Sequence, residues 1–144
     1  MSEPDPPILH RAHIAMNTLR PDSDLVAEVR ALNSAGVEIP WMWHLTEEAF
    51  DGRSKTQEIL TFGINNSVGI LRWNDHSGRY VPALGKNTEW LSYYLAGFHE
   101  SGVPPYAEVP VEIVYSTLTE FLDTRMKPTR VEWREAASPM SQSL

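Results

Sequence analysis

Apolar residues recur along the chain with two different spacings, and each spacing predicts one kind of secondary structure. Residues 21–24 supply proline and short polar side chains that suit the start of a helix, and apolar residues then recur at helical spacing until Gly36. A second amphipathic segment begins near Pro110, which suits the first turn of a helix, and Pro128 is expected to end it. The pattern therefore predicts two helices, each with one apolar face.

Several shorter segments alternate between apolar and polar residues, which predicts strands. The alternation is imperfect over residues 11–19, where a first strand is expected. Asn65-Asn66 suits a two-residue hairpin turn, because asparagine tolerates a positive φ angle. Short turns between successive strands indicate an antiparallel meander. The further strands are expected at residues 41–45, 57–64, 67–73, 79–84, 89–98 and 131–133.

These elements predict an α+β fold in a single domain. An antiparallel sheet of about six strands, with the two amphipathic helices packed mainly on one face, buries all the apolar faces. A chain of 144 residues can bury roughly 68–70% of its unfolded surface, so one core suffices. Residues 1–7 and 136–144 are mostly polar or rich in proline and serine, and we expect them to form flexible tails around a domain of residues 8–135.

The composition narrows the classes of function. The chain contains no cysteine, which excludes disulfides, thiolate zinc sites and cysteine nucleophiles. Its N-terminus does not resemble a signal peptide and no apolar run approaches the ~20 residues of a membrane helix, so we expect a cytoplasmic protein that does not bind membranes. A formal charge of −7 argues against a nucleic-acid partner, because phosphate contacts need lysine and arginine. The same charge suits a basic protein partner.

No segment carries a complete catalytic or metal-binding motif. His10 and His13 are three residues apart, but in a strand they would point to opposite faces. Residues 85–88, Gly-Lys-Asn-Thr, lack the earlier glycine of a phosphate-binding loop. We therefore expect no catalytic residues, no bound metal and no cofactor.

Three motifs in the second half of the chain resemble one protein family. They are the strand Val68-Gly69-Ile70-Leu71-Arg72-Trp73, the helix end Glu120-Phe121-Leu122 and the closing segment Pro128-Thr129-Arg130-Val131-Glu132-Trp133. Through them, residues 57–134 are similar to the Imm1 family of immunity proteins of bacterial polymorphic toxin systems. The resemblance implies a cytoplasmic antitoxin rather than an enzyme. Its partner would be a toxin with a deaminase or nuclease domain, bound one to one with its active site covered.

The resemblance and the negative charge together suggest which side chains contact the toxin. Acidic side chains are expected to face its basic nucleic-acid groove, and aromatic side chains on a solvent-facing side of the sheet are expected to fill a central pocket. Trp73 and Trp133 are expected in the core instead. The candidate partner-binding residues are Glu47, Glu48, Asp51, Asp75, Tyr80, Trp90, Tyr94 and Glu100.

Two other kinds of protein fit the same sequence. The first is a small α+β enzyme or ligand-binding domain with a concave site beside the sheet, where His44 and Glu47 could converge. The second is an adaptor in a larger assembly, which differs from an immunity protein only in its partner.

Overall fold

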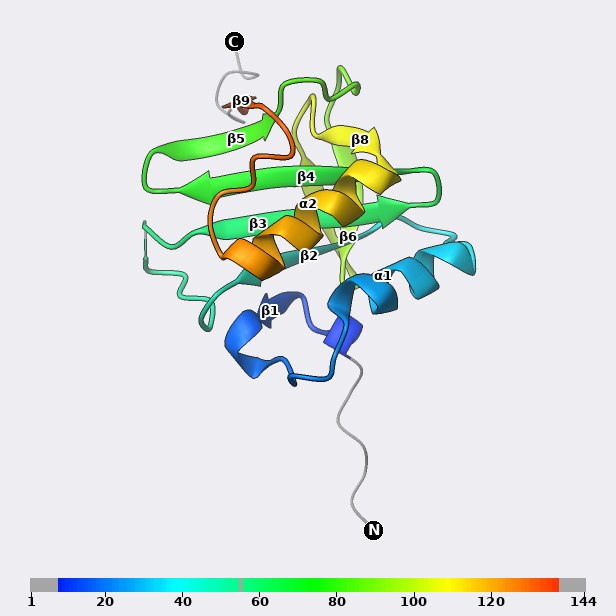
Figure 1. Ribbon diagram of the computed structural model, residues 1–144. Coiled ribbons are helices and arrows are strands. Elements are labelled where there is room, and N and C mark those ends of the chain that lie inside the picture. Colours follow the sequence, from blue (N-terminus) through cyan, green and yellow to red (C-terminus); the bar gives the residue numbers. More distant parts are fainter. Residues whose placement is uncertain (1–7, 55, 138–144) are drawn as a thin grey trace.

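Two helices lie against one face of a large, curled β-sheet (Figure 1). The computed structural model describes residues 8–54 and 56–137. The helices are α1 (Leu25–Ser34) and α2 (Val111–Thr124), and short 3-10 helices lie at Ile8–His10 and Met16–Thr18. The strands are β1 (His13–Ala15), β2 (Trp41–Thr46), β3 (Ile59–Asn65), β4 (Val68–Asp75), β5 (Gly78–Pro82), β6 (Leu91–Leu95), β7 (His99–Val103), β8 (Glu108–Pro110) and β9 (Trp133–Glu135).

The predicted α+β class is confirmed, with both helices on one face of the sheet. Within the described residues the sheet has nine strands rather than about six. Its order is β7-β6-β2-β3-β4-β5-β9, with β1 also paired to β2 and β8 also paired to β4. We call the side covered by α1 and α2 the helix face and the other side the opposite face.

The β3–β4 hairpin forms the centre of the sheet. Asn65 pairs with Val68, so the turn residues are Asn66 and Ser67, one position later than predicted. Asn66 has a φ angle of 63°, which asparagine tolerates. The side chain of Asn33 accepts a hydrogen bond from the amide nitrogen of Asn66 (2.8 Å) and donates to its carbonyl oxygen (2.7 Å). It also donates to the hydroxyl oxygen of Tyr115 (2.9 Å), so one amide joins α1, α2 and the hairpin turn.

Strands β2 and β4 each change neighbours halfway along their length. The first residues of β2 pair in parallel with β6, and its last residues pair in parallel with β1. The first residues of β4 pair with β8, and its last residues pair with β5. In the view of Figure 1, β6 and β7 lie behind the sheet, where they cover part of the opposite face.

The predicted antiparallel meander is therefore wrong after β5. The segment expected to form one strand over residues 89–98 is two strands, because Ala96 (φ 52°) and Gly97 (φ 72°) make a tight turn between β6 and β7. The chain between β5 and β6 then carries β6 to the far side of the sheet, where it joins β2 in parallel. Such pairing leaves no local signal, since the partners are distant in sequence.

The core has two parts, one on each face of the sheet. On the helix face, Trp43 stacks on Phe62 with ring centroids 5.3 Å apart, and Trp73 meets Phe121 edge to face at 5.4 Å. Both tryptophans are fully buried. On the opposite face, β6 and β7 enclose a smaller cluster of Met42, Ile70, Val81, Tyr93, Val103 and Ala107. Trp133 is partly buried at the margin of the larger core, where its Nε1 donates to the Pro128 carbonyl oxygen (2.8 Å).

The helix ends follow the local chemistry of the sequence. Asp24 caps α1 by accepting a hydrogen bond from the amide nitrogen of Ala27 (3.0 Å), and Gly36 leaves the helix with φ +87°. Helix α2 begins directly after Pro110. Its last residue is Thr124, and Arg125 then adopts the left-handed backbone conformation, so the helix ends before Pro128. Of the helices in the described residues, neither α1 nor α2 nor a 3-10 helix has the length and apolar character to cross a membrane.

Replacing Gly69 with alanine is expected to lower the free energy of unfolding by about 1–3 kcal/mol, the usual cost of overpacking. The new Cβ would lie 2.8 Å from Cγ2 of Val114 and would collide with the carbonyl oxygen of Gly63. Urea denaturation measures the change. The control is Gly102→Ala, whose Cβ would make an ordinary contact 3.5 Å from the Trp90 ring. Equal stability of the two variants would contradict the close packing of α2 on β4.

Candidate functional site

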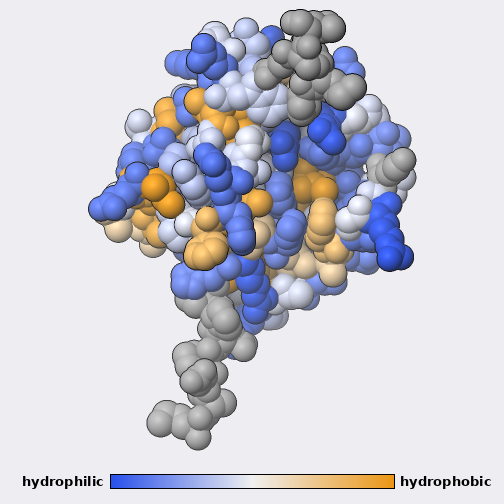
Figure 2. Space-filling model, turned by 180° about the vertical axis from the view of Figure 1, so that it is seen from behind, coloured by the Kyte–Doolittle hydropathy of each residue, from blue (hydrophilic) through white to orange (hydrophobic). Residues whose placement is uncertain are grey.

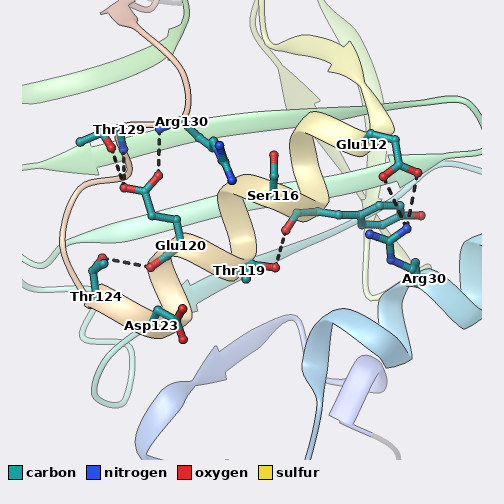
Figure 3. A pocket seen from close by; sticks show the side chains of 10 residues that line it. Arg30, Glu112, Ser116, Thr119, Glu120, Asp123, Thr124, Thr129 and Arg130 are labelled. Atoms are coloured by element: carbon teal, nitrogen blue, oxygen red, sulfur yellow. Dashed lines mark hydrogen bonds and ion pairs between the residues drawn. The ribbon is translucent and has the colours of Figure 1, made fainter.

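A broad groove of the described surface runs along the outer side of α2 (Figure 3). It is open, encloses about 700 Å³ and is lined mainly by polar side chains. Arg30 of α1 approaches Glu112 of α2 at 3.4 Å, and its guanidinium carbon lies 4.3 Å from the centre of the Tyr115 ring. Figure 3 shows these side chains bonded to one another rather than converging on one point in the groove.

At the other end of the groove, Glu120 holds the segment that follows α2. Its carboxylate accepts hydrogen bonds from the amide nitrogen of Thr129 (2.7 Å), the hydroxyl of Thr129 (2.9 Å) and the amide nitrogen of Arg130 (2.9 Å). Desolvation raises the pKa of Glu120, but these hydrogen bonds and the charge of Arg130 outweigh it and lower the pKa below its ordinary value. This carboxylate therefore fixes the chain between α2 and β9.

The eight candidate partner-binding residues fall into two separate groups. Glu47, Glu48 and Asp51 lie in the loop after β2, which we call the acidic loop (residues 47–54). All three are exposed. Glu47 forms an ion pair with Arg125 at the end of α2, with Oε1 and Nη1 3.5 Å apart. Asp51 accepts a hydrogen bond from the amide nitrogen of Arg53 (3.0 Å), which shapes the loop.

Asp75 and Tyr80 belong to the same end of the sheet as the acidic loop, because the β4–β5 turn lies beside the start of β3. Asp75 accepts hydrogen bonds from Trp73 Nε1 (2.9 Å) and from the amide nitrogen and hydroxyl of Ser77 (2.8 and 2.6 Å). Desolvation raises its pKa, but these bonds and Lys127 lower it to about 2. Lys127 also lies over the Tyr80 ring, 4.0 Å from its centre.

The remaining candidates lie on the β6–β7 hairpin. Tyr94 and Glu100 are cross-strand neighbours there, and Trp90 precedes β6. Trp90 and Tyr94 are partly buried rather than fully exposed. The hairpin meets β2 at Trp41 and Met42, the end of β2 farther from the acidic loop. The two groups are thus at different ends of the sheet.

The opposite face also holds a row of basic and polar side chains that the sequence did not reveal. Cross-strand register places His13 beside His44, His44 beside Thr61, and Thr61 beside Arg72, with Asn74 beside Arg79 in the next row. We call this set the basic row. Finding it requires the register between five strands, whereas the spacing along any one strand shows at most two of its residues.

Burial controls the protonation of the basic row. The Nδ1 atom of His44 lies 2.7 Å from Oγ1 of Thr61, and desolvation, with the charges of Arg72 and His13, lowers the pKa of His44 to about 3. Desolvation and Arg79 lower the pKa of Arg72 to about 10. At neutral pH His44 is therefore uncharged and Arg72 remains a cation.

His44 and Glu47, proposed as a convergent pair in the alternative enzyme interpretation, do not meet. His44 bonds to Thr61 on the opposite face, while Glu47 pairs with Arg125 beside the end of α2. Over residues 8–54 and 56–137, no group of three or more His, Asp or Glu side chains is arranged to hold a metal ion.

Asp75→Asn is expected to lower the stability of the protein at neutral pH. Because the folded pKa of about 2 lies below the ordinary value of 3.8, the ionised carboxylate stabilises the folded protein above pH 4, and this contribution disappears as the pH falls through 2. The urea midpoint of the unchanged protein should exceed that of the variant at pH 7, and the difference should shrink between pH 4 and 2. A difference that stays constant over this range would contradict the assignment.

The chain matches a known protein family. The family profile described as immunity protein Imm1 matches residues 22–135, from the turn before α1 to the end of β9. No curated protein matches the chain. The matched region includes the residues 57–134 on which the resemblance was based and extends it across α1 and β2. The chain therefore belongs to the Imm1 family of immunity proteins, whose partners are toxin proteins.

Proposed function

We propose that this protein binds a cognate toxin of a polymorphic toxin system in the cytoplasm and neutralises it by covering the active site in a one-to-one complex. The observation that carries the proposal is the family match across residues 22–135, which includes both helices and most of the sheet. The toxin is a deaminase or a nuclease that acts on nucleic acid. Such enzymes carry basic grooves, because they hold phosphates with lysine and arginine.

The acidic loop is the centre of the proposed contact. It presents Glu47, Glu48 and Asp51 to solvent at one end of the sheet, and the β4–β5 turn with Asp75 and Tyr80 lies at the same end. With a net charge of −7, the protein attracts a basic groove over a long range, which speeds association. The shape of the loop is already set by the bonds of Asp51 and by Gln57, whose side chain accepts from the Asp51 amide (2.9 Å). The loop therefore loses little conformational entropy when it binds a partner.

The β6–β7 hairpin supplies the second part of the contact through Trp90, Tyr94 and Glu100. Phe98, at its turn, is 79% exposed. Aromatic residues carry much of the energy of interfaces, so the hairpin suits a peripheral apolar contact. An inhibitor of a lethal enzyme needs a Kd of about 1 nM or lower, near −12 kcal/mol. An interface of roughly 1,600 Å² that includes both groups would be of standard size.

Binding to the toxin encoded by the neighbouring gene tests the proposal. The purified proteins should form a one-to-one complex in calorimetry, abolish toxin activity and associate more slowly as salt is added. Glu48→Lys in the acidic loop is expected to weaken binding by about 10-fold or more, chiefly by slowing association. Glu28→Lys on α1 is the matched control, because it makes the same charge change on an exposed residue of the helix face. Absence of binding at micromolar concentration would refute the proposal for that toxin.

A further inference from the structure

The basic row is the feature of the molecule that the proposed acidic contact does not use. None of its members, His13, His44, Thr61, Arg72, Asn74 and Arg79, is acidic. Leu71 and Trp73 flank Arg72 in β4 and pack into the core of the helix face, so Arg72 points to the opposite face. Figure 2 shows this side of the molecule, where hydrophilic and hydrophobic residues are interleaved at the surface.

Arg72 is a partly buried cation whose side chain forms no hydrogen bond or ion pair among the described residues. Its Nε atom is inaccessible to solvent and makes no hydrogen bond there, and the same is true of Oδ1 of Asn74. The two ion pairs within residues 8–54 and 56–137 are Arg30–Glu112 and Arg125–Glu47, and neither involves the basic row. The charge of Arg79 acts on Arg72 and repels it.

An arrangement of this kind costs folding free energy, because a charge that loses part of its contact with water and gains no counter-charge is less well solvated. Packing alone would favour an apolar residue at position 72. Groups that are kept in an unfavourable electrostatic environment cluster at functional sites. The arginine therefore points to a ligand that the folded protein does not itself supply.

The chemistry of the row identifies the ligand as an anion. A guanidinium presents its N–H groups as a planar fork that matches a carboxylate with two parallel hydrogen bonds. Arg79 lies in the adjacent row and adds a second charge, while His44 is neutral at pH 7. The bound group thus meets two cations within one patch of the opposite face.

The surroundings of the row favour a carboxylate on a protein over a free polyanion. Phe50 of the acidic loop stacks on His13 with ring centroids 4.3 Å apart, and His13 in turn stacks on His44 at 5.1 Å. The basic row is therefore bordered by the loop that carries Glu48 and Asp51. A phosphate polymer would be repelled by this border, whereas one carboxylate set among basic residues would match both the border and the row.

We propose that Arg72, with Arg79 beside it, receives an aspartate or glutamate side chain of the toxin when the complex forms. The inference rests on the proposed function, since it names a part of the same contact. Deaminases hold a catalytic glutamate in the substrate pocket, and metal-dependent nucleases bind their metal ions through carboxylates. A cation bordered by acidic residues is the charge pattern complementary to a carboxylate at the base of a basic groove.

The test is Arg72→Leu, which keeps the size of the apolar stem and removes the charge. Its affinity for the toxin should fall at least 100-fold, because the toxin's carboxylate is then left buried and unpaired. Its urea midpoint, measured without toxin, should equal or exceed that of the unchanged protein. A purely structural arginine would give the reverse, with a lower midpoint and little change in affinity, and that result would overturn the proposal.

Two further variants show whether the loss of affinity in Arg72→Leu is specific to this guanidinium or follows from a general loss of charge or of folding. Arg72→Lys keeps the charge but not the fork and should bind about 10-fold more weakly than the unchanged protein. Arg130→Leu makes the same substitution at an exposed arginine of the α2 groove and should bind normally. Alanine substitution of the toxin's acidic residues should include one whose effect disappears in the Arg72→Leu background. If every such effect is additive with Arg72→Leu, the proposal is wrong.

The outcomes distinguish this inference from the proposed function. A toxin that binds both the unchanged protein and Arg72→Leu with nanomolar affinity would refute the carboxylate site and leave the immunity function in place. If the unchanged protein fails to bind the toxin, thermal unfolding with sodium acetate or sodium phosphate against sodium chloride at equal ionic strength tests the site alone. Stabilisation by acetate that Arg72→Leu loses would support a carboxylate site. Stronger stabilisation by phosphate, or none by either salt, would overturn it.

Discussion

The fold depends on two glycines that let other elements approach the central β3–β4 hairpin from both sides. A Cβ at Gly69 would meet Val114 of α2 on the helix face, and a Cβ at Gly63 would lie 2.9 Å from the Tyr93 ring of β6 on the opposite face. The two layers that cover the sheet therefore press on neighbouring points of one hairpin. Any side chain at either position would separate a layer from the sheet and open one of the two cores.

Most of the elements near this hairpin could be predicted, because their signals are local. Helical spacing and polar start residues located α1, and period-two alternation located β2, β3 and β4 within a few residues. Strand pairing after β5 could not be predicted in the same way. The Ala96–Gly97 turn interrupts a segment whose apolar alternation continues on both sides, and the parallel pairing of β6 with β2 joins residues about fifty positions apart.

In the candidate site, too, the local features could be predicted from the sequence and the long-range contacts could not. Acidic residues in a polar loop can be recognised as exposed from the sequence, and the structure places Glu47, Glu48 and Asp51 together on the surface. Asp75 looked equivalent in the sequence, yet its carboxylate is engaged by Trp73 and Ser77 and holds a turn. The basic row had no signal of its own, because its members come from β1, β2, β3, β4 and β5 and only the register between these strands brings them together.

The bridge made by Asn33 has a consequence for how the molecule opens. Its amide contacts the hairpin turn through Asn66 and α2 through Tyr115, so a fluctuation that lifts α1 breaks bonds to both at once. The helix layer and the loop end of the central hairpin therefore belong to one cooperative unit. Local opening that leaves this unit intact is then expected only in segments outside it, such as the chain ends of the sheet away from the Asn66 turn.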